Sequence, residues 1–94
     1  MAYLLVRHAV EDYDAWRDVF DDHENVRRDF GSQGGVVGHV AGHSDEVVVV
    51  LEWDDAEHAR DFAESETLRE AMAESGVVGK PDVTFVDDDE RVDY

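Results

Sequence analysis

The chain has 94 residues and a mass of 10.6 kDa, a length that suits one domain and excludes two. Its 25 acidic residues far outnumber the 8 Lys and Arg, and the formal net charge is −17. This charge argues against nucleic acid and anionic membrane surfaces as partners, because both bind basic patches. No apolar run approaches the ~20 residues of a membrane span, and the absence of cysteine excludes disulfides and thiolate nucleophiles.

The acidic residues are spread over the whole chain, beside one Lys, seven Arg, sixteen Val and no Ile. Hydrophobic residues make up 43% and recur periodically, which indicates a folded domain rather than a disordered one. The uncompensated charges repel one another in ordinary salt, whereas at molar salt the Debye length falls to about 3 Å. The composition therefore resembles the cytosolic proteins of extremely halophilic archaea, with an ordinary acidic mesophilic protein as the alternative. No signal-peptide pattern opens the chain, and we expect a cytoplasmic protein.

The first predicted elements are a strand over residues 3–9 and a helix that begins after Asp12. Asp12 is a suitable N-cap, and Gly31 is a suitable C-cap. Between them, apolar side chains at three- and four-residue steps predict a helix of about eighteen residues. The members of this stripe are Tyr13, Trp16, Phe20, His23, Val26 or Arg27, and Phe30.

A hairpin follows, with strands over residues 36–41 and 46–53 and a polar turn at 42–45. Downstream, Asp54 and Asp55 resemble the start of a capping box and predict a second helix from Ala56.

The second helix is expected to bend or break near Ser65 and to end at Gly76. After a connector over residues 77–81, residues 82–86 form the last predicted strand. The acidic residues 87–94 are expected to fray.

The resulting order, β-α-β-β-α-β, predicts one α+β domain over residues 1–94 with a ferredoxin-like fold, a four-stranded antiparallel sheet with two helices on one face. The predicted third strand is apolar on both sides, since Val47, Val49 and Leu51 alternate with Val48 and Val50. Two helices cover only one face, and a large exposed apolar face is rare in monomers. The pattern therefore predicts a homodimer packed sheet against sheet.

Several segments also resemble those of the small dimeric α/β-barrel proteins. Residues 10–17 resemble their junction between first strand and first helix, and residues 59–65 and 68–72 resemble their second helix. Residues 75–81 resemble the segment that leads into their last strand, and the likeness covers residues 3–87. This superfamily includes antibiotic-biosynthesis monooxygenase-like and cyclase-like proteins. The resemblance implies the dimeric α/β-barrel fold and no single catalytic motif.

The five histidines are the candidates for chemistry in a chain without cysteine. His23 lies on the stripe of the first predicted helix, and His39 lies inside the second predicted strand. If both point between sheet and helices, with His8 or Arg7, they can serve as catalytic acid and base. The expected apolar walls of this ligand pocket are Trp16, Phe20, Trp53, Phe62 and Met72.

Each of these residues has a purely structural alternative. His23 and His39 can be hydrogen-bonded structural histidines, and Trp16 and Trp53 can be ordinary core residues. Glu52 can act as a base only if it is buried, and an exposed rim carboxylate is the alternative.

Neither a metal site nor a cofactor is expected. His39 and His43 are four residues apart on a strand and its turn, a separation of about 13 Å. His43 and His58 are expected on the solvated surface. The pair Gly34 and Gly35 precedes a strand rather than a helix, so it does not predict a phosphate-binding loop.

Two functions remain open at this point. The first is a small-molecule-binding protein or cofactor-independent enzyme, monooxygenase-like or cyclase-like, that acts on a planar hydrophobic compound. The second is a non-catalytic dimerisation or stress-linked module without a substrate. A cavity with converging histidines favours the first, and a filled interior favours the second.

Overall fold

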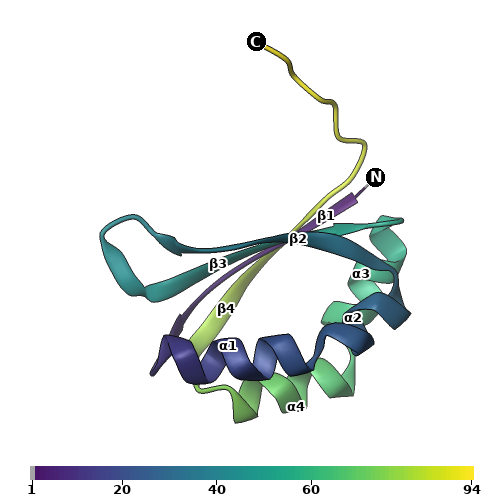
Figure 1. Ribbon diagram of the computed structural model, residues 1–94. Helices are drawn as coiled ribbons and strands as arrows, with labels where there is room; N and C mark the ends of the chain where they lie inside the picture. Colours follow the sequence, from purple (N-terminus) through teal and green to yellow (C-terminus); the bar gives the residue numbers. More distant parts are fainter. Residues whose placement is uncertain (1) are drawn as a thin grey trace.

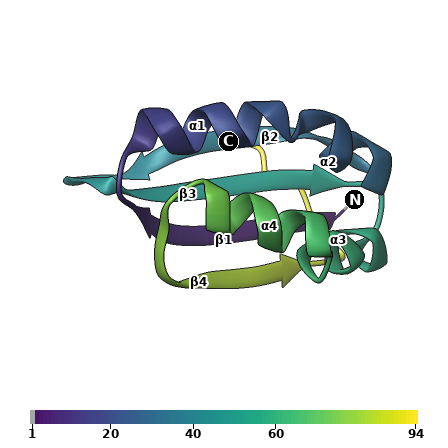
Figure 2. The ribbon, with the colours of Figure 1, turned by 90° about the horizontal axis from the view of Figure 1, so that it is seen from below.

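The structure is a computed structural model that describes residues 2–94. Its elements are β1 (Ala2–Val10), α1 (Tyr13–Asp22), α2 (Glu24–Phe30), β2 (Ser32–Val40), β3 (His43–Trp53), α3 (Ala56–Ala63), α4 (Glu66–Glu74) and β4 (Val77–Val86). The strands form one antiparallel sheet in the order β2-β3-β1-β4. The helices lie on one face, α1 and α2 towards β2 and β3, and α3 and α4 towards β1 and β4 (Figure 1, Figure 2). This is the predicted ferredoxin-like arrangement with each helix divided in two.

The first helix is interrupted at His23, where a continuous helix was predicted. His23 has φ −88° and ψ 5° and separates α1 from α2. In an unbroken helix the carbonyl of Phe20 would accept the backbone N–H of Glu24. Instead it accepts the N–H of His23 at 3.2 Å and the guanidinium Nη1 of Arg27 at 2.5 Å. A side chain inserted into the backbone ladder is a recognised cause of such a bend.

The second helix breaks at Ser65, as predicted. The Ser65 hydroxyl accepts the N–H of Leu68 at 3.2 Å and donates to the carbonyl of Phe62 at 2.7 Å. The same polar group therefore ends α3 and begins α4. The predicted cap of α1 is present, since Asp12 accepts the N–H of Asp14. In α3 the cap is Asp55, which accepts the N–H of His58, whereas the spacing to Glu57 had indicated Asp54.

The strand β2 begins at Ser32, earlier than the predicted start at Val36, because the glycines join the sheet. A Cβ on Gly35 would lie 1.9 Å from the carbonyl oxygen of Val50. Only glycine permits so close an approach of the two backbones.

The strand β4 begins at Val77, where a connector was predicted. Its Pro81 is tolerated because β4 is an edge strand that pairs with β1 alone. The pairing register of β1 with β4 shifts between Arg7 and Ala9, because Arg7 pairs with Asp82 whereas Ala9 pairs with Val78. Such a β-bulge accommodates the extra residues of β4 around Pro81.

The core lies between the sheet and the helices. Alternate residues of β1 and β3 point towards the helices, and Val47, Val49, Leu51 and Trp53 are each at most 5% exposed. Burial of such a side chain stabilises the fold by roughly 1.5–3 kcal/mol. The buried hydrophobic residues of this core are Ala2, Leu4, Val10, Trp16, Val47, Val49, Leu51, Trp53, Ala59 and Phe62.

The opposite face of the sheet carries no helix, and we call its apolar centre the open face: Leu5, Val36, Val48 and Val50. Val50 pairs with Leu5 on one side and Val36 on the other, so the three side chains share this face. Val36 is 67% exposed. Residues 87–94 contain no helix or strand and leave the sheet on this side (Figure 1). Within residues 2–94, no helix is long and apolar enough to cross a bilayer.

Candidate functional site

A cavity of about 310 Å³ lies between the sheet and the four helices. Leu4, Val6, Val49 and Leu51 supply its sheet side. The helices supply aromatic and aliphatic side chains, including Trp16, Val19, Phe20, Phe62, Ala63, Leu68, Ala71 and Met72. The walls are therefore mainly apolar, as in most small-molecule sites.

Six of the eight predicted site residues line this cavity: His8, Trp16, Phe20, His23, Phe62 and Met72. Trp53 lies behind the wall, fully buried, with its ring centre 5.2 Å from that of Phe62. It is thus a core residue, which was the structural alternative.

His39 lies outside the cavity wall, so the expected convergence of His39 with His23 does not occur. It is exposed near the hairpin end of β2, and its ring centre is 4.3 Å from that of Tyr13 at the start of α1. The side chain does face the helix layer. However, it meets the first turn of α1, whereas the cavity lies beneath the later turns.

His23 occupies the bend between α1 and α2, and its ring centre is 5.9 Å from that of Phe62. Its Nε2 atom is buried and has no hydrogen-bond partner among residues 2–94. Burial lowers the pKa of the imidazole below its ordinary value of 6.5, and the positive charge of Arg27 lowers it further. Both effects favour the neutral form of the ring.

His8 is the second imidazole of the cavity, and it is 6% exposed. Its Nδ1 lies 3.4 Å from the carbonyl of Ala9, an acceptor, so Nδ1 is the donor of this long hydrogen bond. The ring meets Trp16 edge to face at 5.5 Å between centres. Burial lowers its pKa below 6.5, although the hydrogen bond to Ala9 opposes this effect.

Arg27 is the main cavity residue that the sequence did not single out. It is 7% exposed, and its guanidinium carbon lies 3.7 Å from the centre of the Phe20 ring. The helical spacing already indicated this position, because either Val26 or Arg27 fits the apolar stripe of the predicted helix. Ser75 and Lys80 also line the cavity and were not predicted.

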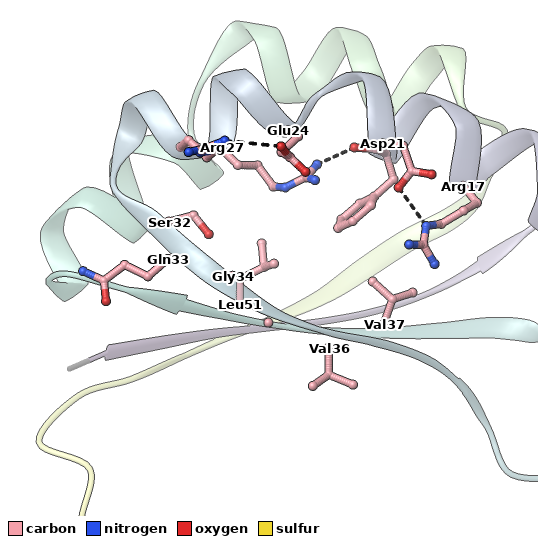
Figure 3. Close-up of a pocket in the computed structure, with 13 residues that line it drawn as sticks. Arg17, Asp21, Glu24, Arg27, Ser32, Gln33, Gly34, Val36, Val37 and Leu51 are labelled. Carbon is pink, nitrogen blue, oxygen red and sulfur yellow. Dashed lines mark hydrogen bonds and ion pairs between the residues drawn. The ribbon is translucent and has the colours of Figure 1, made fainter.

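An open groove of about 800 Å³ runs outside the cavity, between the helices α1 and α2 and the strand β2 (Figure 3). Val37 points towards the helices there, whereas Val36 points away from them (Figure 3). Arg27 lines both the groove and the cavity, so it stands between them.

Two other polar groups belong to the surface. Glu52 accepts a hydrogen bond from the hydroxyl of Tyr3 at 3.3 Å, on the side of the sheet away from the cavity. Asp54, Asp55 and His58 form an exposed cluster with ligand atoms within 4.8 Å. Asp55 caps α3 through the N–H of His58, whose ring lies 2.9 Å from Asp54. This cluster is accounted for as a helix cap.

Comparison with known proteins identifies the fold. No family model and no curated protein matches the sequence. A proposed antibiotic biosynthesis monooxygenase from Deinococcus radiodurans superposes with a TM-score of 0.73 at 11% identity, over 100% of this chain and 98% of that one. A protein from Bordetella bronchiseptica with the same proposed activity gives 0.76 at 12% identity, over 97% and 96%. Rv0793 from Mycobacterium tuberculosis gives 0.69 at 14% identity, over 98% of both.

These likenesses span nearly the full length of both chains at low identity. The chain thus has the ferredoxin-like fold of the antibiotic biosynthesis monooxygenase-like proteins. Identity this low establishes the fold, and the site must supply the argument for function.

Proposed function

We propose that this protein binds a planar, largely apolar small molecule in the cavity and that His23 removes a proton from it. The observation that carries the proposal is the buried Nε2 of His23, which lacks a hydrogen-bond partner in a mainly apolar wall. A buried polar atom without a hydrogen bond is costly, and a ligand hydroxyl would satisfy it. A structural histidine would instead have its ring nitrogens bonded within the protein.

The neutral imidazole is suited to take a proton from a phenolic or enolic O–H group. Nε2 gains the proton, and the O–H electron pair stays on the ligand as an oxyanion or its carbanion form. The carbanion of a ring CH₂ group can react with O₂, so that one oxygen atom enters a new carbonyl and the other leaves as water with the two hydrogens. A ligand that carries a second carbonyl can instead close a ring by adding its carbanion there. The protein would then act as a cofactor-independent monooxygenase-like or cyclase-like enzyme, and the proposed monooxygenase activity of its structural neighbours supports the first of these.

The variant His23→Phe tests this proposal, with His39→Ala as the matched control outside the cavity. Ligand consumption should fall by roughly 10²-fold or more in His23→Phe, the usual contribution of a general base, while His39→Ala keeps its activity. Fluorescence of Trp16 in the wall should still report binding in both. If no aromatic phenol or quinone perturbs the fluorescence, the non-catalytic alternative replaces this proposal.

We further propose that a second copy of the chain covers the open face. A contiguous apolar patch on a sheet is unusual in a monomer. The patch is flanked by polar pairs, since Arg7 bonds Glu46 at 3.0 Å and Tyr3 bonds Glu52 at 3.3 Å. An apolar centre within a polar rim is the usual anatomy of an interface, and two-fold symmetry makes the patch complementary to itself.

The acidic surface supports a third proposal, that the protein works in the salt-rich cytoplasm of a halophile. The net charge of −17 is carried by side chains throughout the chain, not by a tail alone. Molar salt would screen their repulsion.

A further inference from the structure

The cavity differs in charge from the rest of the molecule. Acidic residues number 25 in the chain, yet none is among the described residues that line the cavity. Its charged side chains are both cationic: Arg27, which is buried, and Lys80, which is exposed on β4 and is the only lysine. A protein with so few cations thus places two of them around one apolar space.

Arg27 is unlike the arginines beside it. Arg17 and Arg28 also line the outer groove, but both are exposed, and each is paired with a carboxylate four residues away. These pairs are Arg17 with Asp21 at 2.8 Å (Figure 3) and Arg28 with Glu24 at 3.5 Å. Arg27 has no carboxylate within ion-pair distance among residues 2–94. Asp21 and Glu24 act on it only through space, and burial lowers the pKa of its guanidinium.

A buried cation without a carboxylate partner is unusual, because desolvation is normally offset by an ion pair. The guanidinium remains charged all the same. Of its five N–H donors, one bonds the carbonyl of Phe20 within the described chain. The ring of Phe20 supports one face of the group, which fixes its plane. Donors therefore remain for an acceptor that enters the cavity.

We infer that the ligand of the cavity is an anion, a planar aromatic compound whose carboxylate is bound by Arg27. The inference rests on the proposed function and names the class of compound for the same site. A planar carboxylate matches the guanidinium fork and can accept two parallel hydrogen bonds. The aromatic body then lies against Trp16 and Phe62, within reach of His23. Lys80 at the mouth contributes a favourable potential for an approaching anion.

The test compares 2-naphthoate with 2-naphthamide, which has the same shape and no charge, at one fixed salt concentration. Titration calorimetry reports binding. Wild type should prefer the carboxylate by roughly 10-fold or more, as expected for charge-assisted hydrogen bonds. Arg27→Met should lose this preference and keep its affinity for the amide, which also shows that the cavity is intact. Arg28→Met removes an equal charge from the neighbouring exposed position and should keep the preference.

The outcomes separate the two proposals. If the amide binds wild type as tightly as the carboxylate, or if Arg27→Met keeps the preference, the anion inference is wrong and the cavity remains a ligand site. If neither compound nor any other planar aromatic binds, the proposed function fails and the inference fails with it.

Discussion

Val49 and Val50 are neighbours on β3, yet they lie in two different environments. Val49 is 4% exposed and lines the cavity beneath the helices. Val50 points the opposite way and is flanked by Leu5 and Val36 on the open face. A strand that is apolar on both sides therefore needs two kinds of cover. Helices of the same chain supply one, and we propose that a second copy supplies the other.

Aspartate substitutions at Val49 and Val50 should distinguish the two environments, and we expect the largest effects on stability and assembly from them. Val49→Asp places an unpaired charge in the core and should cost about 3–5 kcal/mol, enough to unfold a typical domain. Val50→Asp, like Val48→Asp, should dissociate the dimer and retain the helical circular dichroism signal. Light scattering measures the particle mass. A wild-type monomer in high salt, or a dimer that persists in Val50→Asp, contradicts the proposed interface.

Salt should change stability strongly, because the acidic side chains lie on the surface and not in the cavity. Between about 0.1 M and about 2 M KCl the Debye length falls from about 10 Å to 2–3 Å, and the repulsion is screened. The melting temperature should rise steeply over this range. A melting temperature that stays constant removes the halophile proposal.

The pKa values of the cavity and surface histidines should be shifted in opposite directions. Burial lowers the pKa of His8 and His23 below 6.5, whereas hydrogen bonding to Asp54 raises that of His58 above it. As the pH falls below 6.5, the unfolded chain binds protons at His8 and His23 before the folded chain does, so the free energy of unfolding decreases. This decrease is complete once the pH lies below the folded pKa values of both histidines. The His58 contribution is present below 6.5 and is lost as the pH rises through its folded pKa.

Proton NMR of the imidazole Cε1–H signals measures these pKa values directly. The variants His23→Phe and His58→Ala assign the resonances and serve as each other's controls. A pKa of His23 at or above its ordinary value of 6.5 would mean that its imidazole is solvated and not buried.

The smallest effect is expected at His39. Its exposed ring contacts the Tyr13 ring in a tilted arrangement outside the cavity wall. His39→Ala should therefore shift the melting temperature by a few degrees at most, the size of an effect below about 1 kcal/mol. It should leave ligand affinity unchanged. Weaker binding in this variant would show that the ligand reaches the first turn of α1.

The order of strands and helices followed from periodicity and caps, because both are local properties of the sequence. Ser65 is an example, since its hydroxyl serves the two helix ends beside it. The bend at His23 was not predictable in this way. It depends on the side chain of Arg27 bonding a carbonyl seven residues earlier, and no single-residue propensity encodes that competition.

The candidate site was predicted in part for the same reason. Residues on the apolar stripe of the first helix, such as Trp16 and His23, reach the cavity because the apolar side of an amphipathic helix packs towards the sheet. The alternation of side chains along a strand also predicts correctly that His39 lies on the face of β2 that is turned towards the helices. Its distance from the cavity depends on where α1 begins above the hairpin, which is a tertiary property. Arg27 was ambiguous because a charge on an apolar stripe is usually assigned to the edge of the stripe.

The proposed function requires that a planar ligand enters the cavity and contacts His23. The most direct measurement follows the histidine Cε1–H signals by NMR while 2-naphthoate is added at constant pH. We expect saturable shifts of the His23 and His8 signals, with those of His39 and His58 unchanged. Shifts confined to the surface histidines, or no saturable shift of His23 with either 2-naphthoate or 2-naphthamide, would contradict this requirement.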